Sequence, residues 1–462
     1  MTIFHSPAPT QEKTPVGIAA DPRTGNPRID LPVEADEQRV TTAVRAARNA
    51  SARWSALTTG ERSQRLLRFA DAVERRADQY VAAERAGTGK PLAEASGEVE
   101  QCVDLIRFYA GAIRTDQSPG SGHRLPGRES WVRWEPLGVV AAIVPWNYPL
   151  LMAVWRFAPA LAAGNAVVVK PAETTPDSML LAAEDAAEVL GPDVLVTVPG
   201  GRDTGRLLVE SPVDVVAFTG SKGGGLDVLA RAGLRRVSLE LGGNCPAIVL
   251  PDAPDYTYER LVGASIYNAG QSCAAPARVI TLRGNYEEVV ERLGEAMRSK
   301  RAGADFGPLN NPDQLARYDR IVDASVAGVR HVGEVLLNDD EAGGYWRPGL
   351  ILADLPDDAP AVMDETFGPA LTVQAVEHED DAVDLANGVS HALAASVWST
   401  SAAGGLGIAR RLDAGEVWVN CHLEQTAELP HGGRKQSGHG TDLSVLAISE
   451  YQRPKTITVN LA

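Results

Sequence analysis

The sequence predicts an α/β fold with two successive sheet domains, and three observations support that class. The chain has 462 residues, which is more than one hydrophobic core usually serves. From Gly138 onward, short β-branched runs alternate with segments long enough to be crossover helices, as in a parallel sheet. A second set of such runs follows Gly270, so we expect a second α/β domain.

The strands of the first set are short and rich in valine. They are expected at 138–145, 166–171, 194–199, 213–218 and 235–243. One crossover helix has clear end signals, because Thr175 can cap it, Pro176 suits its first turn and Gly191 can end it.

The second set of strands is expected at 277–282, 370–376, 395–399 and 415–420, with a helix at 286–298. The segment 36–86 is mainly amphipathic helix, and the final stretch 451–462 alternates like an edge or exchanged strand. Such a strand pairs with another element or with another subunit.

Composition narrows the classes of function. A formal net charge of -16 opposes binding to phosphate backbones and anionic lipid, so we expect small-molecule partners and no nucleic acid or membrane. The most apolar region, 137–169, is interrupted by prolines and polar residues, and no targeting segment is visible, which predicts a cytoplasmic protein. The four cysteines are widely spaced without a local Cys/His cluster, so neither a disulfide framework nor a metal site is expected.

Polar and glycine-rich loops follow four of the predicted strands, at 145–149, 170–176, 218–225 and 240–244. Ligands of open α/β sheets bind at the carboxyl ends of strands, so a site is expected there. The glycine loop at 218–225 can hold a phosphate on backbone N–H groups, although it lacks the G-x-G-x-x-G pattern and could be only a tight turn. Lys170 and Glu173 could grip a ribose or form a surface ion pair.

Seven motifs together resemble the aldehyde dehydrogenase superfamily over nearly the whole chain. They are "PWNYP", "KPAETTP", "FTGS", "LELGG", "GQSC", "ETFGP" and "PHGGRKQSG". The resemblance implies a Rossmann-type cofactor domain, an α/β catalytic domain and a small β oligomerisation element. It places them at 1–116 with 137–241, at 242–436, and at 117–136 with 437–462.

The resemblance also implies catalytic roles. Cys273 would attack the aldehyde as a thiolate, and Asn147 would stabilise the oxyanion together with a backbone N–H. Glu240 would be the general base that hydrolyses the thioester, which favours release of a free carboxylic acid over transfer to coenzyme A. Outside these motifs, Cys273 would be read as a buried thiol, Asn147 as a turn residue and Glu240 as a surface carboxylate.

The implied cofactor is NAD, because Glu173 would repel a 2′-phosphate, although NADP stays possible. The resemblance assigns residues on several loops to this cofactor. They are Ile143, Trp146, Lys170, Glu173, Gly201, Gly220, Ser221, Gly225, Leu241, Glu365 and Phe367.

The substrate is expected to be an ω-aminoaldehyde such as 4-aminobutanal. The motif at 430–438 is most similar to the aminobutyraldehyde and betaine-aldehyde branch, in which aromatic rings enclose a cation. The residues expected at the substrate are Tyr148, Trp155, Tyr267, Cys421 and His431. His431 replaces a tryptophan of plant-type betaine-aldehyde enzymes, which weakens the case for a quaternary ammonium. Asp104, Glu424 and Glu428 could add negative charge or simply be solvated.

Other departures from the family pattern affect proton transfer. Arg156 and Asp442 stand where many relatives have a lysine and a glutamate, and Asn244 replaces a lysine.

The alternatives to the aminoaldehyde hypothesis are a semialdehyde dehydrogenase, a general aliphatic or aromatic aldehyde dehydrogenase and, remotely, a non-catalytic protein with this fold. A homodimer or homotetramer is expected.

Overall fold

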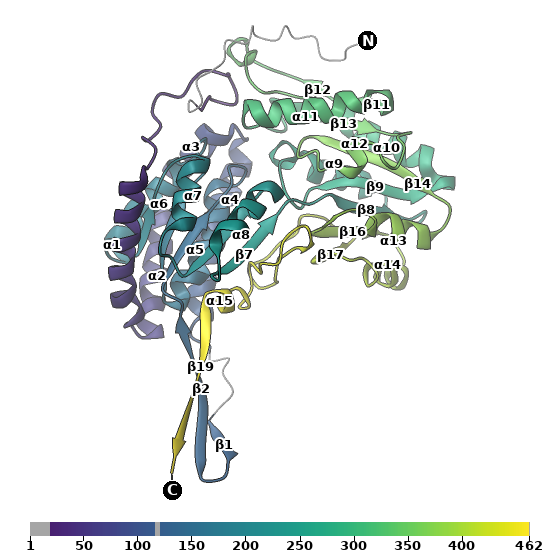
Figure 1. Cartoon of the computed structure of the whole chain (residues 1–462). Helices are drawn as coiled ribbons and strands as arrows, with labels where there is room; N and C mark the ends of the chain where they lie inside the picture. The colour runs from purple at the N-terminus through teal and green to yellow at the C-terminus, as the bar shows by residue number, and fades with distance from the viewer. Residues whose placement is uncertain (1–18, 116–120, 462) are drawn as a thin grey trace.

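The structure is a computed structural model that describes residues 19–115 and 121–461. Two helix-flanked sheets lie side by side, and a narrow sheet projects from the first of them (Figure 1). Residues 1–18, which were expected to belong to the cofactor domain, lie outside the described residues.

The first sheet has five parallel strands, as predicted. Their order is β5 (Leu195–Thr197), β4 (Ala166–Lys170), β3 (Val139–Ile143), β6 (Val215–Gly220) and β7 (Arg236–Leu241). Every residue of β3 and β4 is buried, which is why these strands read as continuous valine and alanine runs rather than alternating ones.

Helices of the first half of the chain pack around this sheet and share its core, together with the short helix α15 (Ala447–Glu450). The helices of the first half are α1 (Glu37–Ser55), α2 (Thr59–Arg75), α3 (Ala77–Thr88), α4 (Leu92–Ala112), α5 (Pro149–Ala163), α6 (Asp177–Val189), α7 (Arg202–Glu210) and α8 (Lys222–Ala232). The predicted helical segment 36–86 is thus confirmed as α1, α2 and most of α3.

The predicted cap of α6 is wrong. The helix begins at Asp177, so Pro176 takes the cap position without a side-chain bond, and the hydroxyl of Thr175 is buried without a partner. Gly191 follows the end of the helix with φ = 108°, a conformation that favours glycine, as the sequence predicted.

The second sheet has seven strands, all parallel to their neighbours except β11. Their order is β11 (Val329–Val332), β13 (Leu350–Leu352), β14 (Ala370–Val376), β9 (Pro276–Leu282), β8 (Cys245–Val249), β16 (Ala394–Trp398) and β17 (Glu416–Val419). The four strands and the helix predicted here are confirmed. Sequence reasoning missed β8, which contains Pro246 and has an irregular register at that residue.

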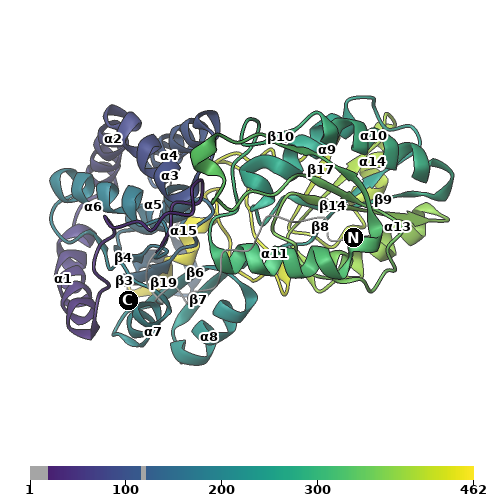
Figure 2. The same cartoon turned by 90° about the horizontal axis from the view of Figure 1, so that it is seen from above.

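Helices of the second half surround this sheet, as the view from above shows (Figure 2). They are α9 (Thr257–Ile266), α10 (Tyr286–Arg298), α11 (Pro312–Ala324), α12 (Pro360–Met363), α13 (Glu379–Asn387) and α14 (Ala402–Ala409). The short elements are the 3-10 turns η1 (Tyr267–Gly270), η2 (Arg283–Asn285), η3 (Val326–Gly328) and η4 (Asp339–Glu341), and the strand pairs β10 (Arg301–Ala302) with β12 (Glu334–Val335) and β15 (His391–Ala392) with β18 (Arg434–Lys435).

The projecting sheet consists of β1 (Gly122–Leu125), β2 (Arg128–Pro136) and β19 (Gln452–Asn460), which follows the short helix α15 (Ala447–Glu450) (Figure 1). β19 pairs antiparallel with β2 from Gln452–Pro136 to Asn460–Arg128. The predicted C-terminal edge strand is therefore confirmed. The assignment of the three parts as cofactor, catalytic and oligomerisation regions stays a prediction.

The side chain of Asn165 links the first sheet to the base of the projecting sheet. Its Oδ1 accepts from the N–H of Gly138 at 2.8 Å, and its Nδ2 donates to the carbonyls of Ala160 and Tyr451, both at 3.0 Å. The side chain is fully buried, so none of these groups can turn to water.

Replacing Asn165 with alanine should therefore lower stability. Each buried backbone group left without a partner costs about 1–3 kcal/mol. We expect Asn165→Ala to lower the midpoints of thermal and urea unfolding clearly, whereas Asn49→Ala on the exposed side of α1 should change them little. Equal midpoints for the two variants would contradict this account.

Candidate active site

Cys273 lies in a constrained loop between η1 and β9. The chain turns sharply before it, because Asn268 and Ala269 have positive φ angles and Gly270 packs tightly. A Cβ on Gly270 would lie 2.3 Å from the carbonyl oxygen of Gly368. The Gln271 amide then donates to the carbonyls of Asn268 and Pro308 at 3.0 and 3.2 Å. These contacts fix the backbone that carries the thiol.

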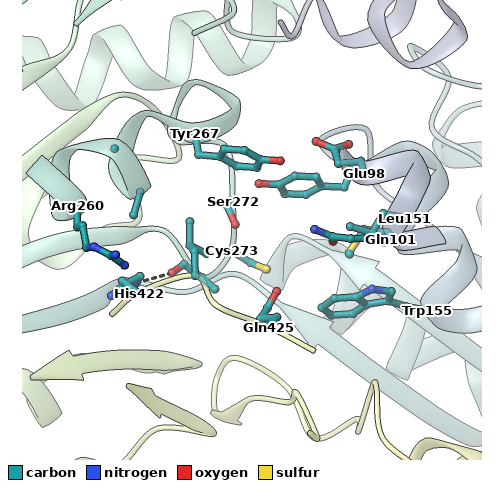
Figure 3. A pocket seen from close by; sticks show the side chains of 16 residues that line it. Glu98, Gln101, Leu151, Trp155, Arg260, Tyr267, Ser272, Cys273, His422 and Gln425 are labelled. Carbon is teal, nitrogen blue, oxygen red and sulfur yellow. Dashed lines mark hydrogen bonds between the residues drawn. The ribbon is translucent and has the colours of Figure 1, made fainter. Parts of the chain in front are cut away.

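A cavity of about 410 Å³ reaches Cys273, and residues of α4, α5, α9 and the loop after β17 line it (Figure 3). Tyr148, Trp155 and Tyr267 lie in its wall, as expected for the substrate site. Cys421 and His431 are not among the lining residues. Three other residues of the Cys421 loop line the cavity: His422, Leu423 and Gln425.

One wall of this cavity combines aromatic rings with a carboxylate. The rings of Tyr148 and Tyr267 stack with centroids 6.4 Å apart and planes at 19°. Figure 3 shows the carboxylate of Glu98 next to Tyr267 in the wall of the cavity. Lys90 pairs with Glu98 at 2.5 Å and lies 4.8 Å from the centre of the Tyr148 ring. Burial raises the pKa of Glu98 to about 8, although Lys90 opposes this shift.

Sequence reasoning missed Glu98 and Gln101 and considered Asp104 on the same helix instead. Asp104 is exposed on α4, whereas Glu98 is almost fully buried. The signal that could have found Glu98 is the amphipathic period of α4, because it lies one turn before the buried Cys102.

A second cavity, of about 530 Å³, lies at the carboxyl ends of β3, β4 and β6. Seven of the residues expected at the cofactor line it. They are Ile143, Trp146, Lys170, Glu173, Gly201, Gly220 and Ser221. The hydroxyl of Ser221 caps α8 by accepting from the N–H of Gly224 at 3.2 Å, so the first turn of this helix faces the cavity.

Gly225 does not line this cavity. A Cβ at Gly225 would lie 2.8 Å from the side chain of Leu241, so this glycine permits close packing of α8 on β7, while Gly223 and Gly224 face the cavity. Leu241 is likewise absent from the cavity wall.

Two more expected cofactor residues are not in the wall of this cavity. Phe367 meets the ring of Trp146 edge-on with centroids 5.5 Å apart. Glu365 accepts from the N–H of Gly243 at 2.9 Å, and burial raises its pKa to about 7.

Lys170 is held by the backbone as well as by Glu173. Its ammonium donates to the carbonyls of Pro171 and Gly200, both at 2.7 Å, and lies 3.8 Å from the Glu173 carboxylate. Burial lowers the pKa of Lys170, while Glu173 opposes the shift. Glu173 itself is more than half exposed, so its carboxylate is accessible to a ligand.

Asn147 is fixed against the Cys273 loop. Its Nδ2 donates to the carbonyl of Gln271 at 2.8 Å, and its own backbone carbonyl accepts from Asn268 at 2.7 Å. A carboxamide nitrogen carries two hydrogens, so one remains for an oxygen bound next to Cys273.

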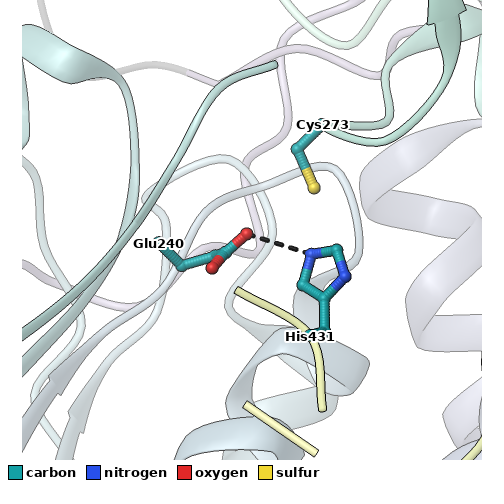
Figure 4. Close-up of side chains that lie close together, drawn as sticks. All are labelled: Glu240, Cys273 and His431. Atoms are coloured by element: carbon teal, nitrogen blue, oxygen red, sulfur yellow. Dashed lines mark hydrogen bonds and ion pairs between the residues drawn. The ribbon is translucent and has the colours of Figure 1, made fainter. Parts of the chain in front are cut away.

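Glu240 and His431 lie together beneath the thiol (Figure 4). Glu240 comes from the end of β7, and its Oε1 lies 3.0 Å from Nε2 of His431. The Cys273 Sγ, one oxygen of Glu240 and one ring nitrogen of His431 lie within 4.8 Å of one another. Cys, His and Glu are also common zinc ligands, and the expectation that the protein uses no metal stays a prediction.

His431 therefore does not occupy the place that the sequence predicted. It is fully buried, and the indole of Trp155 lies edge-on to it, 5.2 Å between ring centres, so it lies behind the cavity wall. Its other ring nitrogen, Nδ1, lies 2.9 Å from the Glu416 carboxylate. His431 thus contacts Glu240 and Glu416 and lies outside the wall of the cavity that reaches Cys273.

The charges around His431 set its protonation. Burial by itself would lower the pKa of His431, but Glu240, Cys273 and Glu416 raise it well above its ordinary value. Burial raises the pKa of the Cys273 thiol, and His431 opposes this shift.

A buried ion pair lies next to this group. Arg156 on α5 reaches Asp442 at 2.9 Å and donates to the hydroxyls of Thr219 and Ser238. Both charged side chains are excluded from water. Burial raises the pKa of Asp442 to about 7, although the guanidinium opposes this shift.

The fold brings a thiol and a carboxylate together, with an amide on the neighbouring loop, and it has a cavity at the carboxyl ends of parallel strands. The aldehyde dehydrogenase family model matches residues 11–457. The chain belongs to the aldehyde dehydrogenase family.

Relatives agree over almost the full length. A Bacillus subtilis (strain 168) protein named as an aldehyde dehydrogenase, DhaS, is 35% identical, with 96% of this chain and 92% of that protein covered. A crystal structure described as an aldehyde dehydrogenase from Burkholderia cenocepacia is 36% identical with a TM-score of 0.92, covering 96% of both chains. A betaine aldehyde dehydrogenase from Staphylococcus aureus, solved in complex with NAD⁺, is 29% identical with a TM-score of 0.92, covering 96% of this chain and 91% of that one.

Among the described residues, we find no helix with both the length and the apolar character that a membrane crossing requires.

Removing the buried guanidinium should destabilise the protein in a pH-dependent way. In Arg156→Met, Asp442 loses its counter-charge, and breaking such a buried pair costs about 3–5 kcal/mol. The folded carboxyl then holds its proton to higher pH than the unfolded one, which ionises near about pH 4. Stability should consequently fall as the pH rises, so the loss relative to the parent is larger at pH 8 than at pH 5.

Thermal unfolding at both pH values checks this, with Arg68→Met on the exposed side of α2 as the matched control. A loss that is the same at pH 5 and pH 8 would refute the role given to Asp442.

Proposed function

We propose that the enzyme oxidises an aldehyde to a carboxylic acid with NAD, through a thioester on Cys273. The observation that carries this proposal is the closeness of the Cys273 thiol to the carboxylate of Glu240, next to a loop on which Asn147 Nδ2 donates to the carbonyl of Gln271. Nucleophile, base and oxyanion donor are the three groups that acyl chemistry on cysteine requires.

The second cavity fits a dinucleotide. It combines backbone N–H groups at the start of α8, which suit a pyrophosphate, with Lys170 and the accessible carboxylate of Glu173, which suit ribose hydroxyls. When bound, NAD accepts the hydride that leaves the substrate carbon. Glu173 favours NAD over NADP, but the exposed Arg202 also lines the cavity and keeps NADP as an alternative.

The first half of the reaction uses the groups around the thiol. The sulfur of Cys273 bonds to the aldehyde carbon, and the carbonyl electron pair moves to the oxygen. Asn147 Nδ2 and the backbone N–H of Cys273 would stabilise that oxyanion, and losing one such donor typically costs about 10²–10³ in rate. Loss of hydride then leaves a thioester on Cys273.

The second half uses Glu240 as the base. Its Oε1 faces His431, whereas its Oε2 is buried without a hydrogen-bond partner in the structure. Such an oxygen is free to accept a proton from the water that attacks the thioester. The C–S bond then breaks and the product leaves as a carboxylic acid.

Two substitutions separate these halves. Cys273→Ala should abolish NADH formation, because no covalent intermediate can form. Glu240→Gln should still form about one equivalent of NADH per site rapidly and then turn over slowly, by about 10²–10⁴-fold, because the thioester is no longer hydrolysed efficiently.

Stopped-flow absorbance of NADH with hexanal measures both effects, and acylated enzyme is detected by mass spectrometry. Cys102→Ala, which removes a thiol buried in the first core, serves as the matched control. Full steady-state activity of Cys273→Ala or of Glu240→Gln would contradict the mechanism.

For the substrate, we propose an ω-aminoaldehyde. The stacked Tyr148 and Tyr267 rings and the buried Glu98 together offer π faces and a carboxylate to a cationic head group. A relative named betaine aldehyde dehydrogenase supports the same substrate class.

A semialdehyde remains the second candidate because Arg260 also lines the cavity. Its guanidinium could hold a substrate carboxylate, although it already lies 3.1 Å from Glu424. A general aliphatic or aromatic aldehyde is the third possibility. A non-catalytic role is the least consistent with a complete set of Cys273, Glu240 and Asn147.

The pH dependence of KM distinguishes cationic from neutral substrates. Burial holds the pKa of Glu98 at about 8, so its carboxylate becomes fully charged only above that pH. We expect KM for betaine aldehyde, which is cationic at every pH, to fall several-fold between pH 7 and pH 9, while KM for hexanal stays nearly constant.

In Glu98→Gln, the KM for betaine aldehyde should change as little with pH as the KM for hexanal does. Asp104→Asn provides the exposed control on α4. Measuring KM for 4-aminobutanal and succinic semialdehyde in the same way completes the substrate comparison. Preference for succinic semialdehyde would overturn the aminoaldehyde proposal in favour of Arg260.

We also propose that β19 and β2 form the contact of a homodimer or homotetramer, since they extend away from the rest of the chain. A cytoplasmic location stays a prediction.

A further inference from the structure

We propose that Cys273, His431 and Glu416 form a catalytic triad in which His431 takes the thiol proton and stabilises the thiolate as its counter-ion. This inference rests on the proposed function, because it assumes that Cys273 is the nucleophile. It gives a catalytic role to a residue that the sequence placed in the substrate wall.

The geometry fixes the histidine as an oriented base. Nδ1 lies 2.9 Å from both Glu416 Oε2 and the amide Nε2 of Gln425, so in the charged ring the N–H on that nitrogen donates to the Glu416 carboxylate. The other ring nitrogen, Nε2, faces the side on which Cys273 and Glu240 lie. Gln425 donates to the same Glu416 oxygen at 3.2 Å and holds it in place. A nucleophile, a base and an orienting group in this order are the elements of a triad.

The backbone leaves the ring little freedom. The N–H of His431 donates to the carbonyl of Asp442 at 2.9 Å, and the N–H of Asp442 donates back at 2.7 Å. Trp155 covers the ring edge-on, and the side chain is fully buried. The imidazole is therefore preorganised, as a catalytic base should be.

The surrounding charges favour an imidazolium. The titratable and charged groups that face it come from five parts of the chain: Glu240 on β7, Glu416 on β17, Cys273 before β9, Arg156 on α5, and Asp442, which pairs with Arg156. Two of these carboxylates lie within 3.0 Å of the ring nitrogens. A cation between them is stabilised as strongly as a buried cation can be, and their effect exceeds that of burial on the pKa of His431.

The proposed step conserves atoms and charge. The S–H bond of Cys273 breaks, its proton bonds to Nε2, and the sulfur keeps the electron pair with which it attacks the aldehyde carbon. The N–H so formed donates to Oε1 of Glu240, which leaves Oε2 for the hydrolytic water. When the C–S bond breaks, the electron pair returns to a sulfur that again faces the imidazolium.

The test measures the thiol directly. We would follow alkylation by iodoacetamide against pH, without substrate or NAD, in a Cys421→Ser parent that removes the other half-buried thiol. His431 is the group that opposes the effect of burial on the pKa of the Cys273 thiol, so removing its charge should raise that pKa further. At pH 6.5, His431→Gln should slow alkylation about 10-fold or more, because one pKa unit changes the thiolate fraction about tenfold. Glu416→Gln should slow it in the same direction by a smaller factor.

Asp413→Asn is the matched control, since this carboxylate lies just before β17 and pairs only with the exposed Arg434 and Lys435 among the described residues. Its alkylation profile should coincide with that of the parent. Unfolding midpoints confirm that each variant is folded.

An unshifted alkylation profile in folded His431→Gln would overturn the triad, and if that variant does not fold, an unshifted profile in Glu416→Gln would do so. The proposed function fails separately, if the parent forms no NADH from betaine aldehyde, 4-aminobutanal, succinic semialdehyde or hexanal while its alkylation profile still depends on His431.

Discussion

The site depends on one contact, the closure of the edge of β7 by the segment 437–440. The N–H of Leu241 donates to the carbonyl of Ser437 at 3.0 Å, and the N–H groups of His439 and Gly440 donate to the carbonyl of Leu239 at 3.1 and 2.9 Å. The approach requires glycine, because a Cβ on Gly438 would lie 2.2 Å from the Leu239 oxygen. These bonds flank Glu240 on both sides, so the backbone fixes where its carboxylate points.

The segment 437–440 follows His431 closely in the chain. Its contact with β7 therefore also brings residues of the two sheets together at one site. Glu240 ends the last strand of the first sheet, Cys273 precedes a central strand of the second, and Glu416 begins that sheet's edge strand. The groups come from distant parts of the chain and none of them is freely solvated. Their mutual charges, rather than water, therefore set the protonation of each one.

Sequence predicted the sheets well because buried parallel strands need β-branched residues on both faces, as in β3 and β4. The motifs that contain Cys273, Asn147 and Glu240 coincide with strand ends and tight turns, and the structure places Cys273 and Glu240 close together, while their catalytic roles stay a prediction. Prediction from sequence failed where position depends on packing between distant elements. The buried carboxylate Glu98 was missed, since charged side chains are usually exposed, and His431 was assigned to the cavity wall, although Trp155 lies in between.

Gly225 illustrates the same limit at the scale of one residue. Its place in a glycine-rich loop indicated a ligand contact, yet only the neighbouring β7 decides that it faces Leu241 and that Gly224 faces the cavity. Spacing along one loop shows that glycine is needed, but the neighbour that requires it belongs to another element.

Arg156 shows how one side chain constrains the chemistry around it. A guanidinium keeps its proton at every pH at which the protein is folded, so it supplies a fixed charge and cannot pass protons on. Apart from the Cys273 thiol, the groups near Glu240 that can change protonation are therefore His431 and Asp442. Of these, Asp442 is already tied to Arg156 at 2.9 Å, whereas His431 connects Glu240 to Glu416, whose side chain is 13% exposed. His431 is consequently the residue through which protons move in this site, and Arg156 supplies a fixed positive charge beside it.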